Sequence, residues 1–166
     1  MKTIKFKDLE IKKLGKEIEL GDKVYFNKYP TVGDFIDNPV VLSKDYTVLT
    51  TYPSIDTSVC EMQIAYLANL SNQFENVDFV AFSMDLPSAL KNYADGHGFG
   101  RMQAFSDYKT KEMANSLGLL LDEVFLFNRA VLVLDKEQKV IYKDINQNSV
   151  GDQVDFDAIK NFLESL

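Results

Sequence analysis

Two short apolar runs, separated by a segment with helical periodicity, constrain the fold of this chain more than any other feature. YTVLTTY (residues 46–52) and VDFVAFS (77–83) are rich in β-branched and aromatic residues, which is typical of buried strands. Between them, Ile64, Leu67 and Phe74 fall near one face of a helix predicted from about residue 58 to 74. This alternation of strand and helix indicates an α/β domain.

The rest of the chain continues the alternation. The further elements that we predict are a helix from Pro87 to about Tyr93, a strand at MQAF (102–105), a helix in TKEMANSLGLLL that weakens at Gly118, a hairpin at RAVLVLDKEQKVIYK (129–143) and a C-terminal helix with Asp155 as its N-cap. This order predicts a central mixed β-sheet with helices on both faces, and a thioredoxin-like fold satisfies it.

The N-terminal part adds strands to this plan. TIKFKDLEIK (3–12) alternates around a turn at Lys7 and Asp8, so we expect an N-terminal β-hairpin extension within residues 1–15. Residues 13–45 contain repeated Gly and Pro breakers, and KVYFNK (23–28) is the one strand candidate there. The length of 166 residues suits a single domain, 1–166.

Composition excludes several function classes. The formal net charge of −7 repels phosphate, so we expect neither a nucleic-acid nor an anionic membrane partner. No apolar run approaches the roughly 20 residues of a membrane span. A single cysteine cannot form an internal disulfide, which favours a reducing, cytoplasmic compartment. One cysteine and one histidine do not make a structural zinc site, and we expect no metal and no cofactor.

The single cysteine lies in YPSIDTSVC (52–60), where the first buried strand turns into the first helix. A thiol reacts as its thiolate, and the unpaired N–H groups of a first helical turn stabilise that form at Cys60. Thr57, three residues earlier, brings a hydroxyl near the sulfur that can bridge the thiolate and a peroxide oxygen. Pro53 has no N–H and can wall the pocket. Taken singly, however, Cys60 reads as an inert core residue, Thr57 as an N-cap and Pro53 as a loop former.

The motif resembles a known family. Pro53, Thr57 and Cys60 match the Pro-x-x-x-Thr-x-x-Cys pattern of peroxiredoxins, and PSIDTSVC resembles the thiol peroxidase subgroup, whose usual members are atypical two-cysteine enzymes. The resemblance continues in order through FSMDLPSAL, FSDY and RAVLVLD and covers roughly residues 45–160. It implies that Cys60 attacks a hydroperoxide and becomes a sulfenic acid, and that Thr57 orients the peroxide. Arg129 would supply the family's arginine, although an arginine before a strand is ordinarily a surface charge.

The chain departs from the subgroup at one position. Most members carry a resolving cysteine after DLP, and here Ala94 occupies the matching position. The sulfenic acid would then be reduced by an external thiol, either a small thiol or a thioredoxin-like protein. A natural one-cysteine enzyme, an engineered replacement at Ala94 and degraded turnover all remain open. His97, the only histidine, lies between glycines and is interpreted as a surface loop residue.

Two functions from different classes fit these residues. The first is a thiol-dependent peroxidase for hydrogen peroxide and organic hydroperoxides, which the presence of Pro53, Thr57 and Arg129 favours. The second is a thioredoxin-like redox sensor or binding module that forms mixed disulfides through Cys60 without efficient turnover, which the missing second thiol favours. The resemblance also implies a homodimer that packs around the active site.

Overall fold

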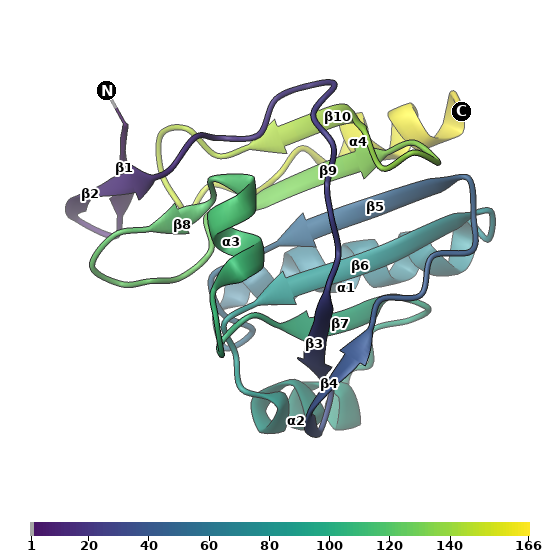
Figure 1. The fold of residues 1–166 in the computed structure, drawn as a ribbon, viewed down its shortest axis with the longest axis horizontal. Coiled ribbons are helices and arrows are strands. Elements are labelled where there is room, and N and C mark those ends of the chain that lie inside the picture. The colour runs from purple at the N-terminus through teal and green to yellow at the C-terminus, as the bar shows by residue number, and fades with distance from the viewer. Residues whose placement is uncertain (1) are drawn as a thin grey trace.

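The computed structural model describes residues 2–166, and its α/β architecture is drawn in Figure 1. In chain order the elements are β1 (Thr3–Phe6), β2 (Leu9–Leu14), β3 (Lys28–Thr31), β4 (Asp34–Pro39), β5 (Tyr46–Thr51), α1 (Ser58–Gln73), β6 (Val77–Ser83), α2 (Pro87–Gly96), β7 (Gln103–Ser106), α3 (Glu112–Leu117), β8 (Leu120–Leu121), β9 (Ala130–Leu134), β10 (Val140–Ile145) and α4 (Phe156–Glu164).

The central sheet has seven strands in the order β10-β9-β5-β6-β7-β3-β4. β5, β6 and β7 run parallel, whereas β9 pairs antiparallel with β5, so the predicted mixed sheet is confirmed. The carboxyl ends of the three parallel strands meet at one edge of the sheet, on the left in Figure 1. Helix α1 begins at this edge, which is where ligands bind in open α/β sheets.

Each central strand sends alternate side chains into two cores. Val48 of β5 packs in one core with Ile64 and Leu67 of α1. Leu49, the next residue, packs in the opposite core with Met113 of α3. Because successive side chains of a strand point to opposite faces, this pattern needs helices on both sides of the sheet. Figure 1 shows α1 behind the sheet and α3 in front of it, as the sequence predicts.

The N-terminal hairpin forms around the predicted turn. β1 and β2 pair antiparallel from Thr3 and Lys12 to Phe6 and Leu9, which leaves Lys7 and Asp8 as the turn. β2 also pairs with β8, giving a small three-stranded sheet. This sheet lies at the same end of the molecule as the carboxyl ends of β5, β6 and β7 (Figure 1).

The expectation for residues 13–45 is wrong in two respects. KVYFNK does not form a strand of its own, since only its last residue, Lys28, belongs to β3, and β3 and β4 form a hairpin where the sequence suggested an irregular segment. Pro30 lies in β3 at an irregularity in its pairing with β4, and Pro39 lies at the end of β4, the edge strand. Proline is tolerated at such positions because no regular ladder hydrogen bond is lost there.

Two helix ends follow from local sequence. α3 stops at Leu117 because Gly118 takes a left-handed conformation with φ of +66°, and the chain then continues into β8. α4 begins after Asp155, whose Oδ1 accepts a hydrogen bond from the Ala158 amide at 3.0 Å, so the predicted N-cap is confirmed. Within residues 2–166, none of the helices is both long and apolar enough to traverse a bilayer.

Candidate active site

Cys60 lies in the first turn of α1, directly behind the loop that follows β5. Thr57 is the N-cap residue in an extended conformation, and Cys60 is the third residue of the helix. The cysteine is fully buried in the core shared by α1 and the central sheet. A thiol in this position is shielded from bulk water while it faces the positive end of the helix dipole.

The loop before Cys60 is fixed by Asp85, which lies between β6 and α2. Its Oδ2 accepts from the Ile55 amide at 2.9 Å and from the Ser83 hydroxyl at 2.8 Å, and its Oδ1 accepts from the Ser54 hydroxyl at 3.1 Å. Burial raises the pKa of Asp85, and these hydrogen bonds act in the opposite direction. Asp85 therefore ties the cysteine loop to the end of the neighbouring strand.

Arg129 is the residue just before β9, and its side chain reaches the sulfur of Cys60. Its guanidinium is buried, and Nη1 donates to Cys60 Sγ at 3.4 Å and to Gln63 Oε1 at 2.7 Å. Nε donates to the carbonyl of Val150 at 3.0 Å. An arginine charge held in this way stabilises negative charge on the sulfur and on an oxygen that is transferred to it.

Gln63 is a site residue that the sequence reading missed. It is fully buried on the apolar face of α1, one turn after Cys60. Its Nε2 donates to Thr50 Oγ1 at 2.7 Å and to the Thr51 carbonyl at 3.0 Å, so its Oε1 is left to accept from Arg129. A glutamine among buried aliphatic residues is a signal that could have found it, because a buried amide needs partners.

Thr57 lies beside the site but bonds locally. Its hydroxyl donates to the Ser54 carbonyl at 3.2 Å and does not cap the helix. Within the described chain, the hydroxyl forms no hydrogen bond with Cys60, and the amides of Ser58, Val59 and Cys60 have no protein acceptor. These amides and the lone pairs of the hydroxyl are free for a bound oxygen, and the peroxide-orienting role of Thr57 stays a prediction.

A cavity of about 190 Å³ opens in front of the buried sulfur. Pro53, Thr57 and Arg129, three of the four predicted site residues, line it. Cys60 lies behind this lining and forms no part of the wall. The remaining wall is largely apolar and includes Val59 and Val150. A small molecule in this cavity contacts Arg129 directly, and Arg129 Nη1 lies 3.4 Å from the sulfur.

The hydroxyl of Tyr52 is a further polar group in the core around Cys60. The residue is fully buried, and of the side-chain polar atoms that the structure describes, its oxygen alone is buried without a hydrogen-bond partner. Burial raises the pKa of Tyr52, so the phenol stays protonated and keeps a donor available.

The two other positions singled out in the sequence lie on and after α2. Ala94 is half-buried and packs against the same core as Cys60. His97 is exposed at the end of α2, where its ring stacks on Tyr93 with 4.6 Å between the ring centroids. The histidine is therefore on the surface and away from the contacts of Cys60.

The fold and the site together define a class of protein. A thioredoxin-like sheet that presents one helix-terminal cysteine to a buried arginine is suited to thiol redox chemistry on a small substrate. The chain itself contains one cysteine, so Cys60 is the only thiol that it can contribute to this chemistry.

Comparison with known proteins narrows this class. Residues 34–143 match the model of the AhpC/TSA family. A thiol peroxidase of Oceanobacillus iheyensis is 30% identical over 171 aligned positions, which cover 98% of this chain and 99% of the relative. One of Staphylococcus aureus is 34% identical over 162 positions and 95% of each chain. The crystal structure of a peroxiredoxin-like protein from Aquifex aeolicus has a TM-score of 0.86 and 27% identity, covering 99% of this chain and 97% of its own.

The chain belongs to the AhpC/TSA family. The resemblance to peroxiredoxins that the motifs suggested is therefore confirmed, together with the thioredoxin-like fold.

Proposed function

We propose that the chain is a thiol-dependent peroxidase that reduces hydrogen peroxide and organic hydroperoxides through a sulfenic acid on Cys60. The observation that supports this most directly is the 3.4 Å hydrogen bond from Arg129 Nη1 to Cys60 Sγ, behind a cavity of substrate size. The names of the relatives agree with this chemistry.

In the first half-reaction, the Cys60 thiolate attacks the terminal oxygen of the hydroperoxide. The S–O bond forms as the O–O bond breaks, and the alkoxide or hydroxide that leaves takes a proton to become an alcohol or water. Arg129 stabilises the charge that moves from sulfur to oxygen, Thr57 orients the peroxide, and Pro53 closes the wall of the cavity.

In the second half-reaction, an external thiol must reduce the sulfenic acid, because the chain has no second cysteine. That thiol attacks the sulfur, releases water and forms a mixed disulfide, and a second thiol then frees Cys60 as the external disulfide forms. Cys60 is fully buried, so a small thiol has to enter through the cavity, or the first turn of α1 has to open for a thioredoxin-like protein.

The single cysteine also favours the second candidate, a redox sensor or binding module that stops at the mixed disulfide. Steady-state turnover separates the two. A peroxidase consumes many equivalents of hydrogen peroxide per chain in the presence of excess dithiothreitol, whereas a sensor consumes about one.

Replacing Cys60 with Ser tests the assignment of the nucleophile. We expect Cys60→Ser to fold, because serine is close to cysteine in size, and to lose peroxide consumption entirely. Arg101→Gln is a control that should keep peroxide consumption. Arg101 donates hydrogen bonds to the main-chain carbonyls of Ser71 and Phe74 and to none of the site residues. Peroxide consumption by the serine variant at the wild-type rate would overturn the proposal.

We also propose a homodimer and a cytoplasmic location. Exposed apolar side chains at Met62 of α1 and Leu86 before α2 flank the cysteine loop and would suit a dimer surface around the site. The single thiol suits a reducing compartment. Light scattering tests the first proposal and fractionation of expressing cells tests the second.

A further inference from the structure

The cavity beside Cys60 has a second wall that comes from the N-terminal hairpin. Main-chain hydrogen bonds join Lys5 to the segment after β10: its amide donates to Asn148 at 3.0 Å, and its carbonyl accepts from Val150 at 2.9 Å. The carbonyl of Val150 in turn accepts from Arg129. The hairpin backbone is thus linked to the site arginine through one residue, and Phe6 and Lys7 at its tip line the cavity.

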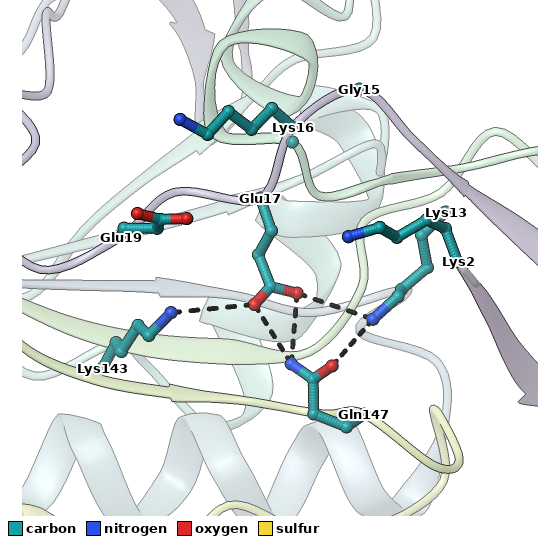
Figure 2. Close-up of a pocket in the computed structure, with 9 residues that line it drawn as sticks. Lys2, Lys13, Gly15, Lys16, Glu17, Glu19, Lys143 and Gln147 are labelled. Atoms are coloured by element: carbon teal, nitrogen blue, oxygen red, sulfur yellow. Dashed lines mark hydrogen bonds and ion pairs between the residues drawn. The ribbon is translucent and has the colours of Figure 1, made fainter.

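The hairpin is held firmly in this place. Figure 2 shows the half-buried carboxylate of Glu17 among Lys13, Lys143 and Gln147, with Lys13 supplied by β2. Lys13 Nζ lies 3.6 Å from Glu17 and 2.9 Å from Gln147 Oε1, and Lys143 Nζ lies 3.8 Å from Glu17. A small apolar core beneath the hairpin adds to this anchor and contains Ile4, Ile11, Leu121 and Val150. The tip is therefore fixed relative to the site.

The charges around the cavity are unbalanced. Of the described residues that line it, two are cations, Lys7 and Arg129, and none is acidic. The guanidinium of Arg129 is already bonded to Cys60 and Gln63. Lys7 is exposed and forms no ion pair with any residue between 2 and 166. Among residues 2–166 of a chain with a formal net charge of −7, this leaves Lys7 as a free cation at the mouth of an apolar cavity.

We propose that Lys7 is a specificity-determining residue that selects organic hydroperoxides carrying a carboxylate. The hydroperoxide group lies against Arg129, whose Nη1 is 3.4 Å from the Cys60 sulfur, the apolar body contacts Phe6 and Val59, and the carboxylate pairs with Lys7. This inference rests on the peroxidase function proposed above. The cavity of about 190 Å³ is smaller than the roughly 300–1,000 Å³ of pockets for drug-sized ligands, so the substrate is small or extends into solvent.

The test uses the full chain and two substrates that differ in one group, the para-carboxylate of cumene hydroperoxide and its uncharged methyl ester. The rate constant for oxidation of Cys60 is measured for each by rapid quench and intact mass, with hydrogen peroxide as a third substrate. We expect Lys7→Met to lower the carboxylate-to-ester ratio about two- to fivefold, the range of an exposed ion pair. Lys7→Arg should restore the ratio, and added salt should lower it in the wild type.

Lys12→Met is the matched control, because Lys12 is an exposed lysine of the same hairpin that does not line the cavity. Its ratio should equal that of the wild type. An unchanged carboxylate-to-ester ratio in Lys7→Met, or an equal fall of this ratio in Lys12→Met, would overturn the role of Lys7. Rapid oxidation by hydrogen peroxide in the same experiment would still support the peroxidase function. Oxidation by hydrogen peroxide no faster than that of a free thiol would overturn the peroxidase function and, with it, this inference.

Discussion

Replacing Arg129 with Gln removes the cation that lies 3.4 Å from the Cys60 sulfur, and its effect on rate follows from that contact. Two unit charges at 3.4 Å interact by about 5 kcal/mol at an effective dielectric constant of roughly 20. Only the part of this interaction energy that differs between the ground state and the transition state affects the rate. A charge-assisted hydrogen bond contributes about 1.5–3 kcal/mol, which corresponds to a roughly 10- to 150-fold fall in the rate constant.

The same substitution lowers stability, because Gln63 Oε1 loses its buried donor, whereas the carbonyl of Val150 loses Arg129 but keeps Asn146 Nδ2 at 3.4 Å. The unsatisfied Gln63 oxygen costs about 1–3 kcal/mol, so the rate must be measured well below the melting temperature. Arg101→Gln also loses hydrogen bonds to main-chain carbonyls and serves as the matched control for stability. Oxidation of Cys60 by excess hydrogen peroxide is followed by rapid quench and intact mass. A rate for Arg129→Gln within twofold of both wild type and control would refute the reasoning.

Three further predictions concern other parts of the molecule. Gly118→Ala should destabilise the fold by at least about 2 kcal/mol in urea unfolding, because the added methyl group overlaps the Lys16 carbonyl at a φ of +66°; a change below about 0.5 kcal/mol would contradict this. Burial raises the pKa of Asp107 to about 6, above its unfolded value of about 3.9. Its contribution to stability is therefore present below about pH 4 and lost as the pH rises through 6, and Asp107→Asn should remove this loss from the pH profile of unfolding; an unaltered profile would count against it. Ala94→Cys should condense with the Cys60 sulfenic acid, so that peroxide lowers the mass by two hydrogens; a persistent gain of one oxygen would speak against the match to a resolving position.

Much of the fold follows from sequence because its central strands are buried on both faces. β5 and β6 show as unbroken apolar runs, and α1 shows as a periodic segment between them. β3 and β4 could not be recognised in the same way, since Pro30, Gly33 and Pro39 read as breakers. Only the pairing of β3 with β7 and β4 makes a proline acceptable there, and pairing is a tertiary property. That residues 1–166 act as one domain remains a prediction.

The site residues likewise differ in how well local sequence predicts them. Pro53, Thr57 and Cys60 are close in sequence, so one motif predicts all three. Arg129 is 69 residues from Cys60, and only the family resemblance separated it from an ordinary surface arginine.

Other residues around the site act through contacts that are distant in sequence. Asp85 bonds the loop about 30 residues before it. Lys7 reaches the cavity because the hairpin pairs with the segment at residues 148–150. No local pattern encodes such a contact, whereas Gln63 could have been found from its polarity on an apolar face.

The most direct test of the central claim is stopped-flow mixing of the reduced chain with one equivalent of hydrogen peroxide, followed by intact mass and peptide mapping. If Cys60 is a peroxidatic nucleophile activated by Arg129, the chain gains one oxygen at Cys60 far faster than a free thiol does under the same conditions. Oxidation at the rate of a free thiol, or oxygen found on methionine while Cys60 remains reduced, would contradict the account.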